Sequence, residues 1–544
     1  MTPPSLRLRL RTVALLLVPS AIFLAYALHR AWPHTLDDGF VFLRYAQNFV
    51  AGDGLAFSPG ERVEGFSNAL WVALLALGGT MGIPYLELAK GLGSAFAGAT
   101  LITSVWLALR LLAARQRGTG AVGGRFGPAS GALAIGGLLV VHPGFGYYAV
   151  SGLGTSLTTL LTVLGVGLHL IDSSDDSSRR SRRCYLPLGF AAITRPDAPL
   201  ILGVVLIQRL WLGRQKERAT ATSGKALAWP GELLTAAVAG LPLLGLLIAR
   251  WLYYGDLLPN TYYAKPSSLA ENPAFVVAYF ANFVTGHGLW LAVVLTSLAV
   301  AAFVRPTHRH IALLVSGPCV THLAVVLCTG GDWLPQDRFI QPVLPLLYLV
   351  PILGLAALPP TSVTPVGLIL FVSVAIRAPV CVRFFDDLDG NSAYDQALTC
   401  ERNVEMARWM AANLEPGSSL LTDEIGAIGL YSGLEILDQW GLVDREVAQI
   451  LHQRRFNPYT RRPDDPERRD VQDAIAVELL SREPDYVTID CRGPVPGPDG
   501  YDPKLVLSIT MAELLQRMGD RYAHVRGFTL MEVPPKTFLL FRAR

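Results

Sequence analysis

The sequence predicts a polytopic α-helical membrane protein with about eleven spans, followed by a C-terminal α/β domain outside the membrane. The 544 residues are 51% hydrophobic and only 16% charged, whereas soluble proteins carry about 25% charged residues. Apolar stretches of spanning length recur as far as residue 383. Residues 384–544 instead carry charges throughout and contain no spanning run. We therefore divide the chain into a membrane domain, residues 1–383, and an outer domain, residues 384–544.

The first expected element is an apolar run from Thr12 to His29, which follows three arginines at positions 7, 9 and 11. A basic segment before an apolar run is also typical of a signal peptide, and Ala25–Tyr26–Ala27 resembles a cleavage site. The run is long for a signal sequence, and apolar stretches continue far beyond it. We therefore expect an uncleaved first transmembrane helix with a cytoplasmic N-terminus.

The loops between the apolar stretches are of two kinds, which sets the expected topology. The basic loops are 115–125, 179–183, 214–225 and 305–310, and the positive-inside rule places them in the cytoplasm. The loops rich in Asp, Asn, Tyr, Trp and Gly are 30–66, 142–155, 253–272 and 329–339. These loops must then face the exterior, together with the outer domain.

The basic loops also fix which stretches must cross twice. Residues 129–171 are expected to go out and return with a turn at His142–Pro143–Gly144, and residues 184–211 with a turn at Arg195–Pro196. Both hairpins have short arms, which predicts thin or re-entrant helices. Single crossings are expected at about 230–252, 287–304, 311–328, 340–358 and 362–383. The region 67–112 must cross only once, so one of its two apolar stretches should lie along the membrane or dip into it.

The outer domain, with about 160 residues, is large enough for its own core. A helix is expected at 401–414, closed by Pro416–Gly417, and a second helix at 508–518. Short apolar runs at 419–422, 486–489 and 537–541 are typical of strands. The domain therefore reads as α/β or α+β.

Charge and cysteine usage exclude two further classes of protein. The formal net charge of +3 is too small to indicate nucleic-acid binding. The 6 cysteines are scattered and lack the close pairs of a zinc site or a redox motif. An oxidising exterior would allow a Cys400–Cys491 bridge, although free buried thiols are equally compatible with the sequence.

Two adjacent carboxylates, Asp37 and Asp38, directly follow the first span. They could be a solvated loop end or the N-cap of a helix at about 40–50. They could equally act as a general base or as metal ligands at the membrane surface. The same external stretch adds further polar candidates, namely Arg44, Tyr45, Asn48, Glu61, Glu64 and Asn68. The presence of these polar residues in the same stretch favours the functional interpretation of the two carboxylates.

The remaining candidates lie in other external segments. Tyrosines near a membrane boundary usually form an aromatic belt, but next to Asp, Asn and Lys they also suit sugar stacking and phosphate binding. An arginine at the tip of a membrane hairpin is a functional-site candidate, and a guanidinium can grip a phosphate with two hydrogen bonds. The candidates are Tyr254, Asn260, Tyr263 and Lys265 from 253–265, Asp332, Trp333 and Arg338 from 330–339, and Arg195 at its hairpin tip. His142, Tyr148 and Ser151 line the other hairpin tip.

Several of these segments resemble glycosyltransferases of the GT-C fold, and the branch related to terminal arabinofuranosyltransferases of the actinobacterial cell wall in particular. The first external loop carries the resemblance in residues 37–46, 54–61 and 63–68. The second and third motifs are residues 254–265 and Gly331–Asp332–Trp333 with Arg338–Phe339. In the outer domain, residues 426–429, 431–433, 437–438 and 440–444 are also similar.

The resemblance implies a membrane enzyme that takes its sugar from a polyprenyl-phosphate donor. In such enzymes an acidic residue of the first external loop is the general base, a role that falls here to Asp37 or Asp38. We prefer Asp37 because it leads the motif. The resemblance also implies that Lys265, Arg338 and Arg195 neutralise the departing phosphate. One departure is Gly154, where the family often has Glu, and this suggests a different sugar or acceptor.

The expected partners are a polyprenyl-phosphate-linked sugar, a glycan, glycolipid or protein acceptor, and the lipid bilayer of the plasma membrane, but no nucleic acid. No required cofactor can be read from the sequence, and a divalent cation on the two acids stays open. Two other functions compete with the enzyme. A flippase of lipid-linked sugars should show inverted repeats and charges through the membrane, which we do not find. A non-catalytic glycan-assembly scaffold would not need Asp37, Asp38, Lys265 and Arg338 together.

Overall fold

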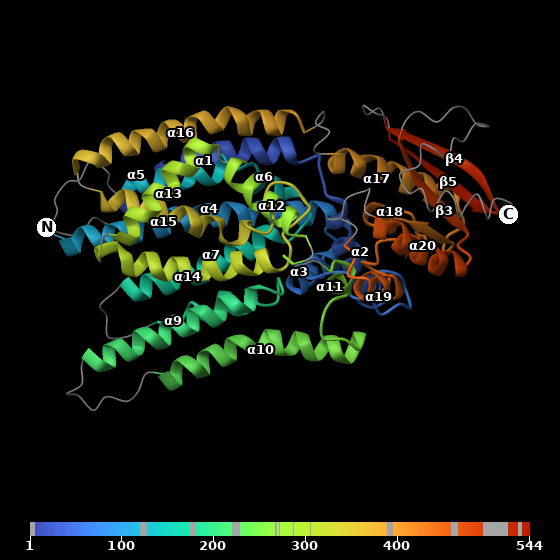
Figure 1. Ribbon diagram of the computed structural model, residues 1–544, viewed down its shortest axis with the longest axis horizontal. Coiled ribbons are helices and arrows are strands. Elements are labelled where there is room, and N and C mark those ends of the chain that lie inside the picture. Colours follow the sequence, from blue (N-terminus) through green and yellow to red (C-terminus); the bar gives the residue numbers. More distant parts are fainter. Residues whose placement is uncertain are drawn as a thin grey trace.

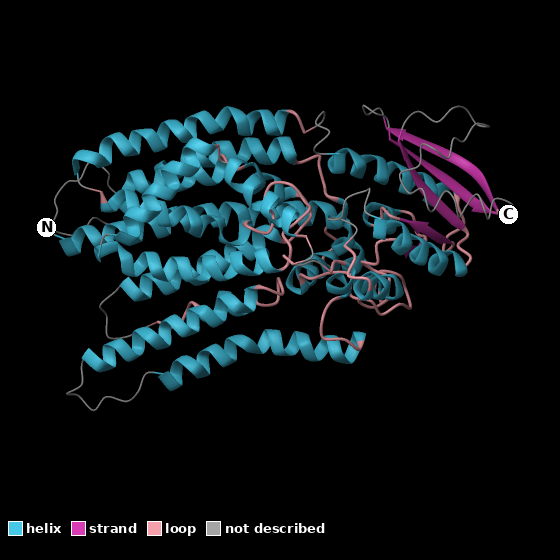
Figure 2. Cartoon of the chain, viewed as in Figure 1, coloured by secondary structure: helices cyan, strands magenta, loops and turns pink. Residues whose placement is uncertain are grey.

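The computed structural model describes residues 6–119, 128–174, 181–219, 229–266, 269–270, 272–286, 288–304, 306–358, 360–388, 395–457, 466–492, 521–530 and 536–544. Figure 1 shows long helices side by side in one bundle, with the strands at the end farthest from the N-terminus. Figure 2 shows that the strands are confined to that end and that loops gather between it and the bundle. This is the predicted order of a helical membrane part and an outer domain.

The membrane part consists of helices, and two short helices lie in the chain between the first two long helices. Its helices are α1 (Leu6–Ala31), α2 (Asp37–Ala51), α3 (Ala69–Thr80), α4 (Tyr85–Thr119), α5 (Pro128–Val140), α6 (Pro143–Val150), α7 (Thr155–Ser174), α8 (Tyr185–Ala191), α9 (Ala198–Ala219), α10 (Trp229–Tyr254), α11 (Asn260–Ala264), α12 (Pro273–Gly286), α13 (Leu289–Val304), α14 (Pro306–Cys328), α15 (Leu344–Ala357) and α16 (Pro360–Asp386), with a 3-10 turn at Gln341–Val343. The helix expected at 40–50 begins three residues earlier, so both aspartates lie in its first turn.

Within the described residues, five helices are long and apolar enough to cross a bilayer, and two bent pairs raise the number to as many as seven. The five are in α4, α7, α10, α14 and α16, and the pairs are α5 with α6, bent by 61°, and α12 with α13, bent by 92°. The sequence estimate of about eleven also includes segments shorter than these, such as α8 with 7 residues. Proline and glycine break these segments in the chain, as at the predicted turn 142–144.

The helix lengths bear on two of the sequence predictions. In the region 67–112, α3 has only 12 residues and α4 has 35. At about 1.5 Å per residue, α3 cannot cross a hydrocarbon core of about 30 Å. The arm before Arg195 is short as expected, because α8 has 7 residues, but the prediction of short arms is wrong for α7 and α9, which have 20 and 22 residues. One apolar helix, α12, was not predicted as an element of its own.

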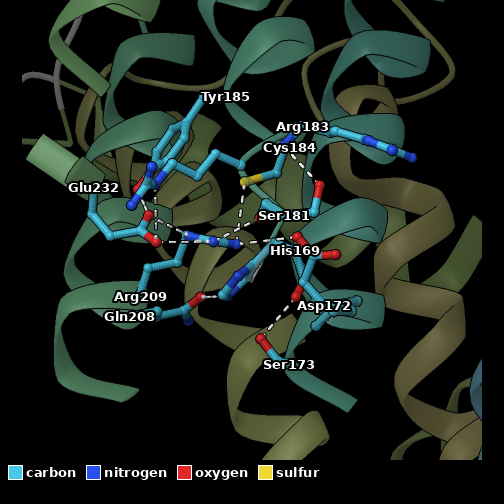
Figure 3. Close-up of polar contacts among 12 residues, drawn as sticks. His169, Asp172, Ser173, Ser181, Arg183, Cys184, Tyr185, Gln208, Arg209 and Glu232 are labelled. Atoms are coloured by element: carbon cyan, nitrogen blue, oxygen red, sulfur yellow. Dashed lines mark hydrogen bonds and ion pairs between the residues drawn. The ribbon is translucent and has the colours of Figure 1, made fainter. Parts of the chain in front are cut away.

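A buried polar network joins α7, α8, α9 and α10 away from the outer domain (Figure 3). The Arg209 guanidinium donates to both carboxylate oxygens of Glu232, at 2.8 and 3.1 Å, and lies 3.4 Å from Asp172. Tyr185 donates to the same Glu232 carboxylate at 3.0 Å. Most of α10 faces outward, so this network is what fixes its first turn to the bundle.

The outer domain is a mixed α/β layer. Its elements are α17 (Asp395–Asn413), β1 (Ser419–Thr422), α18 (Gly426–Tyr431), β2 (Glu435–Asp438), α19 (Arg445–Gln453), α20 (Pro466–Ser481), β3 (Tyr486–Arg492), β4 (Tyr522–Leu530) and β5 (Lys536–Ala543). The sheet order is β2-β1-β3-β5-β4; β1 pairs in parallel with β2 and β3, and β5 is antiparallel to β3 and β4. The three predicted strands are confirmed, whereas β2 and β4 were missed. The helix expected at 508–518 and the side chains of Cys400 and Cys491 lie outside the described residues.

The first external loop packs directly into the outer domain. Phe40, Tyr45 and Trp71 belong to the same hydrophobic cluster as Ile428 and Val443 of the outer domain. A shared core of this kind holds two parts in a fixed orientation, unlike a flexible linker. The side chains of α2 are therefore placed by contacts on both sides, and this sets the geometry of the site described next.

Candidate functional site

A cavity of about 460 Å³ lies where the external loops of the membrane domain meet the outer domain. We call it the main cavity. Its polar lining includes Asp38, Asn68, Thr155, Arg195, Asp197, Lys265, Asp332, Trp333, Arg338 and Asn457. Its apolar lining includes Phe66, Leu153, Leu200, Leu258, Val325, Val326 and Phe339. Seven of the fourteen predicted site residues line this cavity, and they come from four separate segments, as expected.

The charged centre of the main cavity is a chain of alternating acids and bases. The Asp38 carboxylate lies 3.7 Å from the Arg338 guanidinium and 3.9 Å from the Lys265 ammonium. Arg338 also donates to both oxygens of Asp332, at 2.7 and 2.9 Å. Asp332 therefore orients Arg338 by a two-point contact, whereas Asp38 touches both cations only loosely. Burial lowers the pKa of Lys265, and Asp38 opposes this effect.

The backbone before Arg338 adopts a conformation that non-glycine residues rarely take. Gln336 and Asp337 have φ values of 60° and 59°. A left-handed residue other than glycine costs about 1–2 kcal/mol, so surrounding contacts must hold this turn. The Tyr148 hydroxyl donates to the Pro335 carbonyl, and the His142 imidazole lies 3.5 Å from the Asp337 carboxylate. The α6 residues at the predicted hairpin tip thus support the turn that carries Arg338.

Arg195 also lines the main cavity and lies in the loop between α8 and α9. Its guanidinium donates to the Asp197 carboxylate at 2.8 Å. It also stacks over the Phe339 ring at 4.5 Å, and the guanidinium of Arg338 lies over the same ring at 4.8 Å. One aromatic side chain therefore holds two cations by cation–π contacts, each facing the same cavity.

The wall beside Gly154 is closed by packing. Asn68 caps α3 by accepting from the Trp71 amide at 3.0 Å, and the Trp71 indole donates to the Gly152 carbonyl at 2.9 Å. A Cβ atom on Gly154 would lie 2.4 Å from the Asn68 side-chain nitrogen and 2.9 Å from the Trp71 ring. The glycine that departs from the family pattern is thus required here, because Asn68 and Trp71 fill the space of a side chain.

Asp37 does not line the main cavity, which corrects our preference for it as the base. Its carboxylate accepts from the backbone amides of Gly426 and Ala427 at 2.6 and 3.0 Å, at the start of α18. The Asn403 amide lies 3.5 Å away. Burial, followed by repulsion from Glu424, raises the pKa of Asp37 to about 7. Asp37 therefore docks α2 onto the outer domain, while Asp38 faces the cavity.

Two other predicted residues of α2 hold the first external loop. Arg44 donates to the Phe57 carbonyl at 3.2 Å. The Tyr45 hydroxyl donates to the Val63 carbonyl at 2.6 Å and accepts from the Gly65 amide at 2.7 Å. Both residues act on the backbone of residues 57–65, and neither lines the main cavity. Their placement is structural, contrary to the prediction of substrate contacts.

The remaining predicted residues outside the cavity fix the segment that carries Lys265. Glu64 forms a buried two-point ion pair with Arg250 of α10, with contacts of 2.8 to 3.0 Å. Asn260 donates to carbonyls of residues 441, 442 and 444 in the outer domain, at 2.7 to 3.2 Å. Tyr254 donates to the Leu55 carbonyl at 2.7 Å, and Tyr263 to Asp256 at 3.0 Å. These residues position α11, and Lys265 directly follows it.

Sequence reasoning missed several residues that line or support the main cavity. The apolar wall residues Leu200, Val325 and Val326 belong to helix ends that looked like ordinary spans, and Asp197 lies in the predicted turn beside Arg195 but was not chosen as a site residue. His322 of α14, which lies behind Asp197, carried no local signal because it is a lone polar residue in an apolar stretch. Tyr262 lines the cavity rather than the predicted Tyr263. Among the described residues, no group of three or more His, Cys, Asp or Glu side chains could hold a metal ion.

Comparisons with known proteins agree with this architecture. Residues 390–534 match a family described as a domain of unknown function (DUF8728). A "terminal beta-(1->2)-arabinofuranosyltransferase" of Mycobacterium tuberculosis is 30% identical over 269 residues, which are 48% of this chain and 39% of that protein. This chain thus matches about two fifths of the length of that relative.

Crystal structures of ArnT from Cupriavidus metallidurans, bound to undecaprenyl phosphate and in the apo state, both have a TM-score of 0.57. They are 13% and 14% identical and cover 97% and 96% of this chain, and the chain covers 97% of each. The chain therefore has the ArnT fold and is an integral membrane protein, which confirms the predicted fold class. The predicted similarity to the arabinofuranosyltransferase-like branch is confirmed as well.

Proposed function

We propose that this chain is a membrane glycosyltransferase. It transfers a sugar from a polyprenyl-phosphate donor to a hydroxyl group of an envelope glycan, glycolipid or protein on the non-cytoplasmic face. One observation carries the proposal: the Asp38 carboxylate, Arg338 and Lys265 face one another in the main cavity, at 3.7 and 3.9 Å. Displacement at an anomeric carbon needs a base on one side and positive charge for the leaving phosphate on the other.

The mechanism starts from the loose contacts of Asp38. Lys265, Arg338 and Arg195 bind the donor phosphate. Asp38 then loses its contacts with Lys265 and Arg338, and its carboxylate is free to accept the proton of the acceptor hydroxyl. The acceptor oxygen bonds to the anomeric carbon as the bond from that carbon to the phosphate oxygen breaks. The electron pair leaves with polyprenyl phosphate, whose charge the three cations stabilise. Asp332 stays on Arg338 throughout and keeps its orientation.

The apolar side of the main cavity suits the lipid part of the donor. Leu200 of α9 and Val325 and Val326 of α14 line it together with Leu153. A polyprenyl chain can lie against such a wall while its phosphate reaches the cations. The ArnT structure solved with undecaprenyl phosphate supports a lipid-phosphate ligand in this fold.

Topology follows from the same proposal. The basic loops and the N-terminus lie in the cytoplasm, and the outer domain, residues 384–544, lies outside the plasma membrane with the main cavity. The end of α16 at Asp386 supports the domain division at residue 383. The Mycobacterium tuberculosis relative makes an arabinofuranosyl donor the first to test. The closed wall at Gly154 supports a sugar or acceptor that differs from those of relatives with an acid there.

A transfer assay in membranes tests the proposal. Membranes containing the chain are incubated with a radiolabelled polyprenyl-phosphate sugar, and products are separated from the donor. We expect label in a larger product, and loss of this signal in Asp38→Asn. A flippase would move the donor between leaflets without forming the product, and a scaffold would show neither activity. Normal transfer by the Asp38→Asn variant would contradict the assignment of Asp38 as the general base.

A further inference from the structure

His322 of α14 lies buried behind the wall of the main cavity and contacts two groups. Its Nε2 atom is 2.6 Å from the Phe339 carbonyl oxygen. Its Nδ1 atom is 2.9 Å from one carboxylate oxygen of Asp197. The other Asp197 oxygen accepts from Arg195 at 2.8 Å. Arg195, Asp197 and His322 thus form a row, which we call the Arg–Asp–His row.

The two contacts of His322 determine where its protons are. A carbonyl oxygen only accepts, so Nε2 must carry a proton. Nδ1 faces a carboxylate oxygen, and two lone pairs at 2.9 Å would repel. Within the described part of the chain neither of these two atoms has an aligned hydrogen-bond partner, so their 2.9 Å contact is an ion-pair contact. The two contacts together favour a proton on each ring nitrogen, which makes His322 an imidazolium.

Asp197 is ionised in this arrangement. Burial alone would raise its pKa, but Arg195 and His322 outweigh burial and hold the pKa of this carboxyl below its usual range. With a neutral histidine, Arg195 and Asp197 would be a closed ion pair with no net charge. With the imidazolium, the Arg–Asp–His row carries one positive charge, and the only member that both lines the cavity and is cationic is Arg195.

We infer that His322 is a positioning residue that makes Arg195 an anion receptor. The imidazolium takes up the charge of Asp197, so that Arg195 keeps its positive charge available to the phosphate of a lipid phosphate in the main cavity. The Phe339 carbonyl fixes His322, and the Phe339 ring fixes Arg195 at 4.5 Å, so one residue aligns both ends of the row. This inference rests on the proposed function for the identity of the ligand as a polyprenyl phosphate.

A binding experiment on the purified full chain in detergent tests the inference without any transfer step. The probes are a polyprenyl monophosphate and the polyprenol of the same length, which lacks the phosphate. The variants are His322→Gln, which keeps a donor for the Phe339 carbonyl but removes the charge, Asp197→Asn, and the double variant. Thermal unfolding and size-exclusion chromatography show which variants are folded.

We expect His322→Gln to weaken binding of the phosphate about tenfold or more, as for a lost charge-assisted contact, with polyprenol binding unchanged. The double variant restores the charge balance and should return within about threefold of the wild type. Equal loss for both probes, or no recovery in the double variant, would show a purely structural role and overturn the inference. Unchanged phosphate binding by folded His322→Gln would overturn it too.

A direct measurement of the protonation state of His322 tests the inference if His322→Gln does not fold. Histidine labelled with ¹⁵N in the wild type should give one imidazole signal with both nitrogens protonated at about pH 7.5, assigned by its absence in the spectrum of His322→Asn or His322→Phe, whichever folds. A neutral tautomer at this position would overturn the inference. If the wild type binds no lipid phosphate but shows the imidazolium, the proposed function fails while the Arg–Asp–His row stands.

Discussion

Replacing Asp38 by Asn removes the proposed base and leaves the shape of the side chain. The Asp38 side chain is 24% exposed, and its contacts with Arg338 and Lys265 are 3.7 and 3.9 Å long. Partly exposed ion pairs of this kind contribute about 1 kcal/mol or less, so the variant should fold. Arg338 also keeps its two hydrogen bonds to Asp332.

The effect on turnover should be much larger than the effect on folding. A positioned general base contributes about 10²–10⁴-fold to a rate, so kcat for sugar transfer should fall by that factor in Asp38→Asn. Donor binding should remain within a few fold of the wild type or become tighter, because Lys265 and Arg338 no longer share their charge with Asp38. The assay is transfer from a radiolabelled polyprenyl-phosphate sugar at varied donor concentration.

Asp37→Asn is the matched control, since the two residues are neighbours and the chemical change is the same. The amide side chain of this variant would keep one acceptor for the two backbone amides at the start of α18 and place an N–H group against the other. A buried unsatisfied donor costs about 1–3 kcal/mol, so this variant should lose stability. The retained acceptor should keep α2 docked on α18 in the folded fraction, which should therefore transfer sugar within a few fold of the wild-type rate per molecule. Turnover retained in Asp38→Asn, or lost equally in both folded variants, would contradict this assignment.

Four further predictions concern other parts of the chain. Because the pKa of Asp37 is raised to about 7, its carboxyl takes up a proton on folding, and its contribution to stability is present below about pH 4 and is lost as the pH rises to about 7. The melting temperature should fall over this range, and with a smaller slope in Asp37→Asn. Gly154→Ala should destabilise the chain by about 1–3 kcal/mol because its Cβ collides with Asn68 and Trp71, and thermal unfolding measures this. Arg209→Ala removes the two-point ion pair of the buried Glu232, which keeps the Tyr185 hydroxyl at 3.0 Å and Arg182 at 3.6 Å, and should lower stability by about 3 kcal/mol, whereas transfer by the folded fraction should persist. Addition of EDTA should leave transfer unchanged, because Lys265 and Arg338 neutralise the negative charge of the leaving phosphate without a metal ion.

The features that could be predicted from the sequence are those that leave a local pattern of residue types. Hydropathy, basic loops and turn residues placed the break at 142–144, the short arm before Arg195 and the strands of the outer domain. The sequence did not predict α12 as an element of its own or the 92° bend between α12 and α13, since a run of apolar residues does not reveal whether its helix is straight or bent. The strands β2 and β4 were missed because the two apolar residues of β2 are flanked by Glu435 and Asp438, and because β4 alternates without a clear apolar face.

The candidate site was predicted in part, for a similar reason. Asp38, Lys265, Asp332 and Arg338 come together because three of the predicted external loops, 30–66, 253–272 and 329–339, share one end of the bundle, and topology alone was enough to expect this. Polar residues in the same loops, such as Tyr45 and Asn260, were indistinguishable from them by type. Their side chains bind the backbone of a neighbouring segment, and such partners cannot be inferred from position in a loop. The sequence alone could not identify His322 as a candidate, because the residues that it contacts lie in distant segments.

Asp37 and Asp38 show how a helix separates two residues that look equivalent in the chain. Both lie in the first turn of α2, where successive side chains point about 100° apart. One direction meets the amides at the start of α18, and the other meets the main cavity. Docking of the outer domain through Asp37 therefore also sets the rotation of α2, and with it the direction of Asp38. On this reasoning the outer domain contributes to transfer through the orientation of the base, even though the cations that face Asp38 all belong to the membrane domain.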